Sequence, residues 1–188
     1  MKDFILQEVA TIDFQILYFI QEHLRCTVLD AVMPVITYSG SAGIIWIITA
    51  FILIMIKKYR VCGMKMLIGM MAGLIIGNLL LKNLIARERP CWIDTELQML
   101  IPVPHDYSFP SGHTTASVIS AVMLMQETKK LGIPACILAS LIAFSRMYLF
   151  VHFPTDILGG LILGLIIGLS VNYIWNRISA SKKETPSS

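Results

Sequence analysis

The chain has 188 residues, of which 56% are hydrophobic, and a mean hydropathy of +0.73. A water-soluble domain of this length has too small a core to bury so much apolar surface, so a soluble globular protein is excluded and much of the chain must lie in a bilayer. The net charge of +3 comes without a basic run interleaved with aromatic residues, which gives nucleic-acid binding little support. The four cysteines are scattered without a C-x-x-C pair, which argues against a zinc site or a disulfide framework.

The N-terminal part of the chain indicates helices that do not span the membrane. In residues 3–24, apolar side chains recur at roughly helical spacing among acidic and amide residues, which predicts an amphipathic helix in the membrane interface. Residues 28–38 predict a second short helix that ends at a Ser39-Gly40-Ser41 break. The alternative for this region is one more short transmembrane helix. No signal-peptide pattern is present at the N-terminus, so we expect mature protein from Met1 onward.

Five apolar stretches follow, and each is expected to form a transmembrane helix: 43–56, 61–81, 114–125, 131–151 and 157–175. A span needs about 20 residues, because each residue advances ~1.5 Å across a core of ~30 Å. The first stretch is short by this measure and is expected to recruit residues 38–42 or to lie where the bilayer is thin. Barrel-type alternation is absent, so the spans should be helical.

The predicted fold class is therefore an all-α integral membrane protein, a helical bundle of five transmembrane helices, or six in the alternative. We expect N-terminal interfacial helices in residues 1–41, the transmembrane core in 42–177 and a cytoplasmic tail in 178–188.

Basic residues at the helix ends predict the orientation. They form three clusters: Lys57, Lys58, Arg60 and Lys65; Lys129 and Lys130; and Arg177, Lys182 and Lys183. With five spans the three clusters share one side, which the positive-inside rule makes cytoplasmic, together with the C-terminus. The loop 87–110 and the turn 150–154 then lie on the extracytoplasmic side.

Three polar segments meet on this outer face, and the first runs from Lys82 to Pro90 with the sequence K-N-L-I-A-R-E-R-P. Lys82 and Arg89 are two helical turns apart, so both are predicted to project from one helix face, with the helix ending at Arg89 before the proline. Cations near the end of a span also snorkel to lipid headgroups, and this is the alternative for the pair. Arg87 and Glu88 are interpreted as a rim pair or as headgroup contacts.

The second segment is F-P-S-G-H-T, residues 109–114, directly before an apolar stretch. Gly112 permits a close approach of a ligand to the backbone, and the free amides at the start of the following helix point toward an anion. Ser111 can donate a hydroxyl hydrogen bond, and His113 lies where it could transfer a proton. The alternative is a simple N-cap, at Ser111 or Thr114, beside an unrelated histidine.

The third segment runs from Ser145 to Asp156. Arg146 interrupts an apolar run, a costly placement that indicates a functional role. Asp156 follows His152 by four residues and could hold one imidazole nitrogen protonated, which leaves the other as a nucleophile. If Arg146 and Asp156 only neutralise each other, His152 has no explanation. Together the three segments supply the cations, helix N-terminus, histidines and carboxylate that metal-free phosphoryl transfer requires.

The motifs K-x6-R-P, P-S-G-H and S-R-x5-H-x3-D, in this order on consecutive membrane helices, resemble the signature of the type-2 phosphatidic acid phosphatases, which are relatives of the vanadium haloperoxidases. The resemblance covers residues 82–156 and every motif position. It implies that His152 attacks phosphorus, that Asp156 orients it, and that His113 protonates the leaving oxygen and then activates water. It also implies phosphate binding without a metal or cofactor by the following residues: Lys82, Arg89, Ser111, Gly112 and Arg146.

We therefore expect a lipid phosphatase of the cytoplasmic membrane whose site faces outward. Undecaprenyl diphosphate is the favoured substrate, because small members of the family often recycle that cell-wall carrier; phosphatidylglycerol phosphate and phosphatidic acid are close rivals. The alternatives are a phosphotransferase, a haloperoxidase and a non-enzymatic lipid-phosphate binding or transport protein. His105 is expected to be a surface residue, and Trp92 and Tyr107 either anchor at the interface or line the substrate entrance. The sequence does not indicate the oligomeric state.

Overall fold

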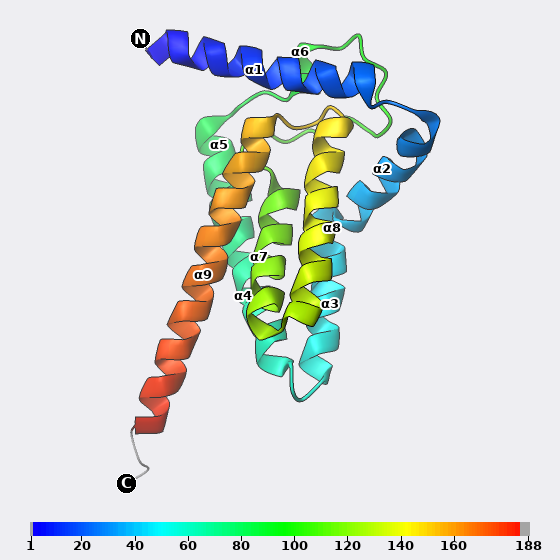
Figure 1. Cartoon of the computed structure of the whole chain (residues 1–188). Helices are drawn as coiled ribbons and strands as arrows, with labels where there is room; N and C mark the ends of the chain where they lie inside the picture. Colours follow the sequence, from blue (N-terminus) through cyan, green and yellow to red (C-terminus); the bar gives the residue numbers. More distant parts are fainter. Residues whose placement is uncertain (1, 185–188) are drawn as a thin grey trace.

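The computed structural model describes residues 2–184, which form helices and connecting loops without a β-strand, so the predicted all-α class is confirmed (Figure 1). The helical elements are α1 (Lys2–His23), α2 (Thr27–Ser39), η1 (Ser41–Gly43), α3 (Ile44–Met55), α4 (Arg60–Gly73), η2 (Leu74–Leu81), α5 (Lys82–Ile85), α6 (Pro90–Ile93), α7 (Gly112–Glu127), α8 (Lys129–Tyr148) and α9 (Pro154–Glu184).

Helix α7 lies at the centre of the bundle, packed against α4, α8 and α9 (Figure 1). Glycines on its neighbours allow this packing. A Cβ atom on Gly164 of α9 would lie 2.7 Å from Val118 Cβ, and one on Gly69 of α4 would lie 2.7 Å from Ile119 Cγ2. Small residues at helix contacts are typical of membrane bundles, where close backbone approach provides the packing energy. The glycines thus fix the position of α7, whose first turn carries part of the site.

Three helical stretches are long and apolar enough to cross a membrane: Arg60–Ile93, Lys129–Tyr148 and Pro154–Ser181. A fourth candidate is the pair Thr27–Ser39 and Ser41–Met55, bent by 45° at the predicted break; Ala42 and Gly43, directly after that break, have positive φ angles of 51° and 70°. Helix α7 has 16 residues, fewer than the ~20 that a span requires. The predicted count of five or six transmembrane helices therefore stays a prediction.

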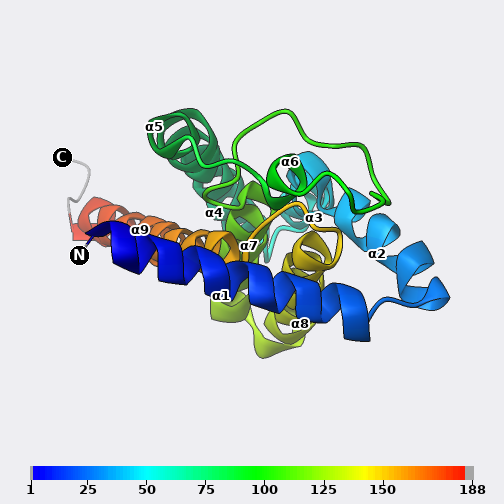
Figure 2. The ribbon, with the colours of Figure 1, turned by 90° about the horizontal axis from the view of Figure 1, so that it is seen from above.

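Helix α1 lies across one end of the bundle and contacts α8 and α9 there (Figures 1 and 2). Asp13, Leu17 and Ile20 are spaced for one helix face and are buried against the bundle. Another face exposes apolar side chains, among them Ile12 and Phe19. The helix lies where the sequence predicts one, but the burial of Asp13, an acidic residue, was not expected from the amphipathic pattern.

The predicted helix through Lys82 and Arg89 is wrong. Helix α5 ends at Ile85, Ala86 adopts a left-handed conformation with φ 49°, and Arg89 is extended with φ −84° and ψ 152°. The extended Arg89 is the conformation that the following Pro90 favours, and Pro90 then begins α6. The two cations therefore project from different elements and not from one helix face.

The α3–α4 turn, the α7–α8 connection and the C-terminal end of α9 lie at one end of the bundle, and α1, α6 and the loop before α7 lie at the other (Figure 1). The basic clusters at Lys57–Lys65, Lys129–Lys130 and Arg177 consequently share one end, as the sequence predicts. Helix α9 continues to Glu184, beyond the predicted boundary of the core at residue 177. Residues 185–188 of the predicted tail lie outside the described residues.

Candidate active site

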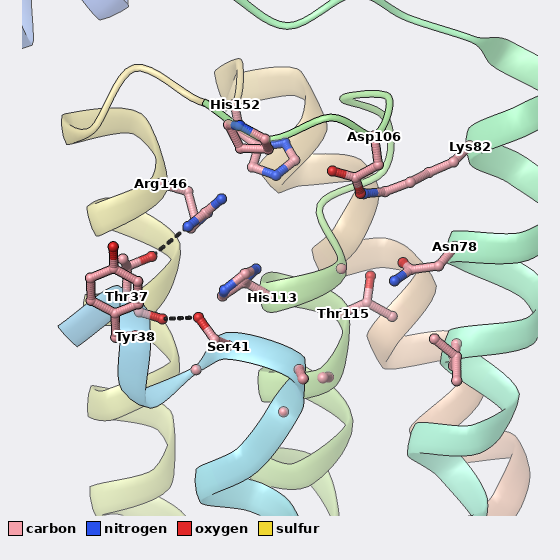
Figure 3. Close-up of a pocket in the computed structure, with 18 of the residues that line it drawn as sticks. Thr37, Tyr38, Ser41, Asn78, Lys82, Asp106, His113, Thr115, Arg146 and His152 are labelled. Carbon is pink, nitrogen blue, oxygen red and sulfur yellow. Dashed lines mark hydrogen bonds and ion pairs between the residues drawn. The ribbon is translucent and has the colours of Figure 1, made fainter. Parts of the chain in front are cut away.

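A cavity of about 820 Å³ lies at the α1 end of the bundle, with walls from α2, η1, α3, α4, η2, α5, α7, α8 and the loop before α7. The residues at its polar end come from all three predicted motifs: Lys82, Arg89, Gly112, His113, Arg146 and His152 (Figure 3). The two histidines line the same cavity. Ser111 and Asp156 are fully buried and do not line the cavity; they lie behind the residues that do.

His152 lies in the turn between α8 and α9, where it is 1% exposed. Its Nε2 atom is 3.1 Å from Arg89 Nη1, and its Nδ1 atom is 3.4 Å from Asp156 Oδ2. Because a guanidinium can only donate, Nε2 is the acceptor with the lone pair and Nδ1 carries the proton that faces Asp156. Burial, followed by the charges of Arg89 and Arg146, lowers the pKa of His152 well below its usual value of 6.5. The imidazole is therefore neutral, with a lone pair available at Nε2.

Asp156 begins α9 and receives donors on both oxygens. Its Oδ2 accepts from the amide of Phe153 at 2.8 Å and from the hydroxyl of Ser108, in addition to facing His152. Its Oδ1 accepts from Arg87 Nη1 at 2.8 Å. With both oxygens bonded, the carboxylate is fixed in orientation beside the imidazole.

Arg87 connects Asp156 to the N-terminal helix. Its second terminal nitrogen, Nη2, is 2.6 Å from Oδ2 of Asp13, and its guanidinium lies 4.1 Å from the ring centre of Phe153. Asp13 also accepts from the amide of Thr155 at 3.1 Å and from its hydroxyl at 2.5 Å. Arg87 therefore pairs with Asp13 and Asp156, and not with Glu88 as one interpretation of the sequence proposed.

Lys82 and Arg89 share a carboxylate from the loop before α7. Lys82 Nζ pairs with Asp106 Oδ2, and Arg89 Nη2 lies 2.8 Å from Asp106 Oδ1. Arg89 also donates from Nε to the backbone oxygen of Asp106 at 2.7 Å and from Nη1 to that of Val151 at 2.6 Å. Burial opposes ionisation of Asp106, but the hydrogen bonds and charges of Lys82 and Arg89 outweigh it and lower the pKa of Asp106 to about 2.

Arg146 and His113 keep unused nitrogen atoms at the cavity. Arg146, 5% exposed, donates from Nη1 to the hydroxyl of Thr37 at 2.6 Å. Its Nε and the Nε2 of His113 are buried and have no hydrogen-bond partner among the residues described. Buried polar atoms without a partner are rare in native proteins, and here they mark the place where a polar ligand fits. The alternative interpretation, a simple Arg146–Asp156 pair, does not apply, because Asp156 pairs with Arg87.

The first turn of α7 forms one wall of the site. Ser111 is its N-cap, with Oγ accepting from the amide of Thr114 at 3.4 Å and from its hydroxyl at 3.0 Å. The amides of Gly112 and His113 have no partner within a helix that begins at Gly112, and such amides favour an anion. Asn78 packs directly on Gly112, where an added Cβ would lie 2.7 Å from Asn78 Oδ1. Gly112 therefore allows the close approach of Asn78, whereas the approach of a ligand stays a prediction; Ser111 acts as the capping residue of the alternative interpretation.

Sequence reasoning missed several residues that complete the site: Asp13, Thr37, Asn78, Asp106 and Ser108. Asp106 and Ser108 precede the P-S-G-H motif by a few positions, and a polar residue so close to a motif is a usable signal. Asp13 and Thr37 belong to the N-terminal helices, whose contact with the site cannot be read from spacing. Across residues 2–184, no group of three or more His, Cys, Asp or Glu side chains is arranged to hold a metal ion.

Known proteins resemble this chain in sequence and in structure. The sequence model of the PAP2 superfamily matches residues 63–179. The chain is 33% identical over 142 residues to undecaprenyl-diphosphatase BcrC of Bacillus subtilis, with 76% of this chain and 72% of that protein covered. It is also 33% identical over 121 residues to an undecaprenyl-diphosphatase of Sulfolobus acidocaldarius, where the match spans 64% of this chain and 58% of the relative.

Among solved structures, the transmembrane PAP2 type phosphatidylglycerolphosphate phosphatase of Bacillus subtilis superposes with a TM-score of 0.66. The two chains are 26% identical, and the superposition covers 91% of this chain and 96% of that one. The likeness extends over nearly the whole of both chains.

The Asp13–Arg87 contact yields a stability prediction. Asp13→Asn removes the charge that pairs with a largely buried guanidinium, so we expect a loss of about 1–3 kcal/mol in the free energy of unfolding. The measurement is thermal unfolding of the purified protein in detergent. Asp94→Asn is the matched control, because Asp94 also contacts α1, through the Tyr18 hydroxyl at 2.9 Å, but at an exposed position. Equal melting temperatures for the two variants would contradict the role assigned to the buried pair.

Proposed function

Because the chain belongs to the PAP2 superfamily, we propose that it hydrolyses a lipid phosphate or diphosphate through a phosphohistidine formed on His152. One observation carries this proposal: a neutral histidine, a second histidine with an unpartnered nitrogen, and three cations line one cavity. A pure binding or transport site needs the cations but has no use for a nucleophile held in a single tautomer.

In the proposed first step, the lone pair on His152 Nε2 attacks phosphorus. A phosphorus–nitrogen bond forms while the bond from phosphorus to the leaving oxygen breaks, and His113, in its protonated form, gives that oxygen a proton and becomes neutral. In the second step, His113 takes a proton from water as the water oxygen attacks phosphorus. The phosphorus–nitrogen bond breaks, inorganic phosphate forms, and the electron pair returns to His152.

The charged groups act on the phosphoryl oxygens throughout both steps. Arg146, Arg89 and Lys82 balance the negative charge, and the amides of the first turn of α7 donate to the same oxygens. Asp156 faces Nδ1 and stabilises the positive charge that develops on His152 as Nε2 becomes phosphorylated. Positioning and charge stabilisation of this kind supply most of the catalysis in phosphoryl transfer.

The shape of the cavity supports a lipid substrate. Beyond its polar end the cavity continues along apolar side chains of α3, α4 and η2: Ile47, Leu67, Met70, Met71 and Leu74. A pocket that is cationic at one end and apolar along the rest suits a phosphate joined to a hydrocarbon tail. Two relatives carry the name undecaprenyl-diphosphatase, which favours that substrate. Phosphatidylglycerol phosphate, named for the structural neighbour, and phosphatidic acid are the next candidates.

We place the protein in the cytoplasmic membrane with the cavity on the extracytoplasmic face. This placement is supported by the three basic clusters, which lie together at the opposite end of the bundle (Figure 1). The positive-inside rule assigns that end to the cytoplasm. The C-terminus then lies in the cytoplasm, and α1 lies in the outer interface.

The histidines provide the direct test. His152→Ala should abolish phosphate release, because the nucleophile is gone, and His113→Ala should lower kcat about 10²- to 10⁴-fold, the usual contribution of a general acid–base group. The assay measures phosphate released in detergent from undecaprenyl diphosphate, phosphatidylglycerol phosphate and phosphatidic acid side by side. His23→Ala, at the exposed end of α1, is the control and should retain wild-type activity. Turnover by folded His152→Ala would refute the proposed nucleophile.

We also expect activity without a metal ion, because Lys82, Arg89 and Arg146 already provide the positive charge that metal ions supply in other phosphoryl-transfer sites. The wild-type protein is assayed with excess EDTA and then with Mg²⁺ restored. The expected rate is unchanged in both conditions. A complete loss that Mg²⁺ reverses would show a metal enzyme.

The orientation is testable by cysteine labelling in intact cells. In a chain whose exposed Cys26 and Cys136 are replaced by alanine, His105→Cys should react with a membrane-impermeant maleimide. Lys58→Cys, at the other end of the bundle, should react only after permeabilisation. The reverse pattern would invert the proposed topology.

A further inference from the structure

Asp106 holds the position that a phosphate oxygen needs. Its carboxylate faces the cavity and takes both Lys82 and Arg89, the two cations of the first motif (Figure 3). The side chains of these partners are 6% and 2% exposed, whereas that of Asp106 is 56% exposed. Two buried cations of the site are thus paired with a carboxylate that reaches them from an open loop.

We propose that Asp106 is an internal counter-ion that the phosphate group of the substrate displaces, and that it thereby sets the affinity of the site for phosphate and favours dianionic groups. This inference rests on the proposed function. It assigns Asp106 a part in substrate selection that neither the motifs nor the family resemblance contains.

The three cations of the site need such a counter-ion. Lys82, Arg89 and Arg146 line one cavity away from bulk water, where cations that repel one another are costly unless they are paired. Asp106 is ionised at neutral pH, since its pKa lies near 2, and so it supplies the charge. Arg146 Nε and His113 Nε2 have no partner within the described part of the chain. The Asp106 carboxylate therefore occupies Lys82 and Arg89, whereas Arg146 and His113 can bind the incoming phosphate directly.

The carboxylate can leave without releasing the loop. The backbone of the loop has its own contacts with Arg89, from Nε to the Asp106 oxygen at 2.7 Å and from Nη2 to the Tyr107 oxygen at 3.3 Å. Trp92 donates to the Pro104 oxygen at 3.0 Å and holds the loop from the other side. Rotation of the half-exposed Asp106 side chain toward solvent is enough to free Lys82 Nζ and Arg89 Nη2. Carboxylate and phosphate use the same arginine donors, so the exchange keeps the donor geometry.

The exchange discriminates by charge. A phosphate monoester carries about −1.5 to −2 at neutral pH, more than the single charge of Asp106, and so gains interaction energy when it displaces the carboxylate. A phosphodiester headgroup carries one charge and gains none. Asp106 would thus keep the abundant diester lipids of the surrounding bilayer out of the cation site, and the same competition would speed release of the phosphate product.

The test uses inorganic phosphate as the probe and the full chain in detergent. The dissociation constant is measured by the shift in thermal unfolding over a phosphate titration. Asp106→Asn removes the charge and keeps the backbone contacts, so phosphate should bind roughly tenfold more tightly, since hydrogen bonds of charged groups are strong. With lipid substrate, KM and kcat should both fall, and a phosphodiester lipid should become a stronger inhibitor. Glu88→Gln, the same charge change at an exposed position beside Arg89, should leave phosphate affinity unchanged.

Two outcomes overturn the inference. If folded Asp106→Asn binds phosphate as the wild type does, or more weakly, the carboxylate does not compete with phosphate. If Asp106→Asn does not fold, Asp106→Ser takes its place, and failure of both to fold would make Asp106 a structural anchor and not a displaceable group. If neither the wild type nor folded Asp106→Asn binds phosphate, the proposed function is refuted instead, so the two failures are distinguishable.

Discussion

The structure depends on the balance of positive charge at one end of a membrane bundle. Lys82, Arg89 and Arg146 lie where water is scarce, and cations in such surroundings are stable only with partners nearby. These partners come from segments outside the long helices: Asp106 from the loop before α7 and Thr37 from α2. The cations consequently do more than prepare for an anion. They hold the loop and the second helix in place over the cavity.

The same constraint explains how the reactive imidazole is held. His152 is neutral beside Arg89, and its proton faces Asp156, whose second oxygen is bound to Arg87. Arg87 in turn binds Asp13 of α1, 74 positions earlier in the chain. A helix across the end of the bundle thereby fixes a carboxylate behind the proposed nucleophile. This accounts for a buried acidic residue in a helix whose sequence pattern indicates only a membrane surface.

The sequence was sufficient for the helical class, the location of most helices and the convergence of three motifs, because apolar runs and motif spacing are local properties of a chain. The sequence was not sufficient where long-range contacts or loop geometry determine the position of a side chain. The continuous helix from Lys82 to Arg89 was wrong because Ala86 turns left-handed after Ile85. Asp106 was missed because its pairing with Lys82 joins residues 24 positions apart through a loop. Asp13 looked like part of a polar face, since nothing in α1 itself reveals that Arg87 lies opposite.

The shortness of α7 has a consequence for the membrane around the protein. Sixteen residues rise about 24 Å, whereas the hydrocarbon layer is about 30 Å thick. In the proposed orientation, with the end beside Lys129 at the cytoplasmic boundary of this layer, α7 brings its first turn to a depth several ångströms below the outer headgroup plane. For the proposed reaction, a lipid would then have to sink, or the leaflet would have to become locally thinner, before its phosphorus reached His152. The thickness of the surrounding bilayer thus enters the energetics of the reaction through hydrophobic mismatch.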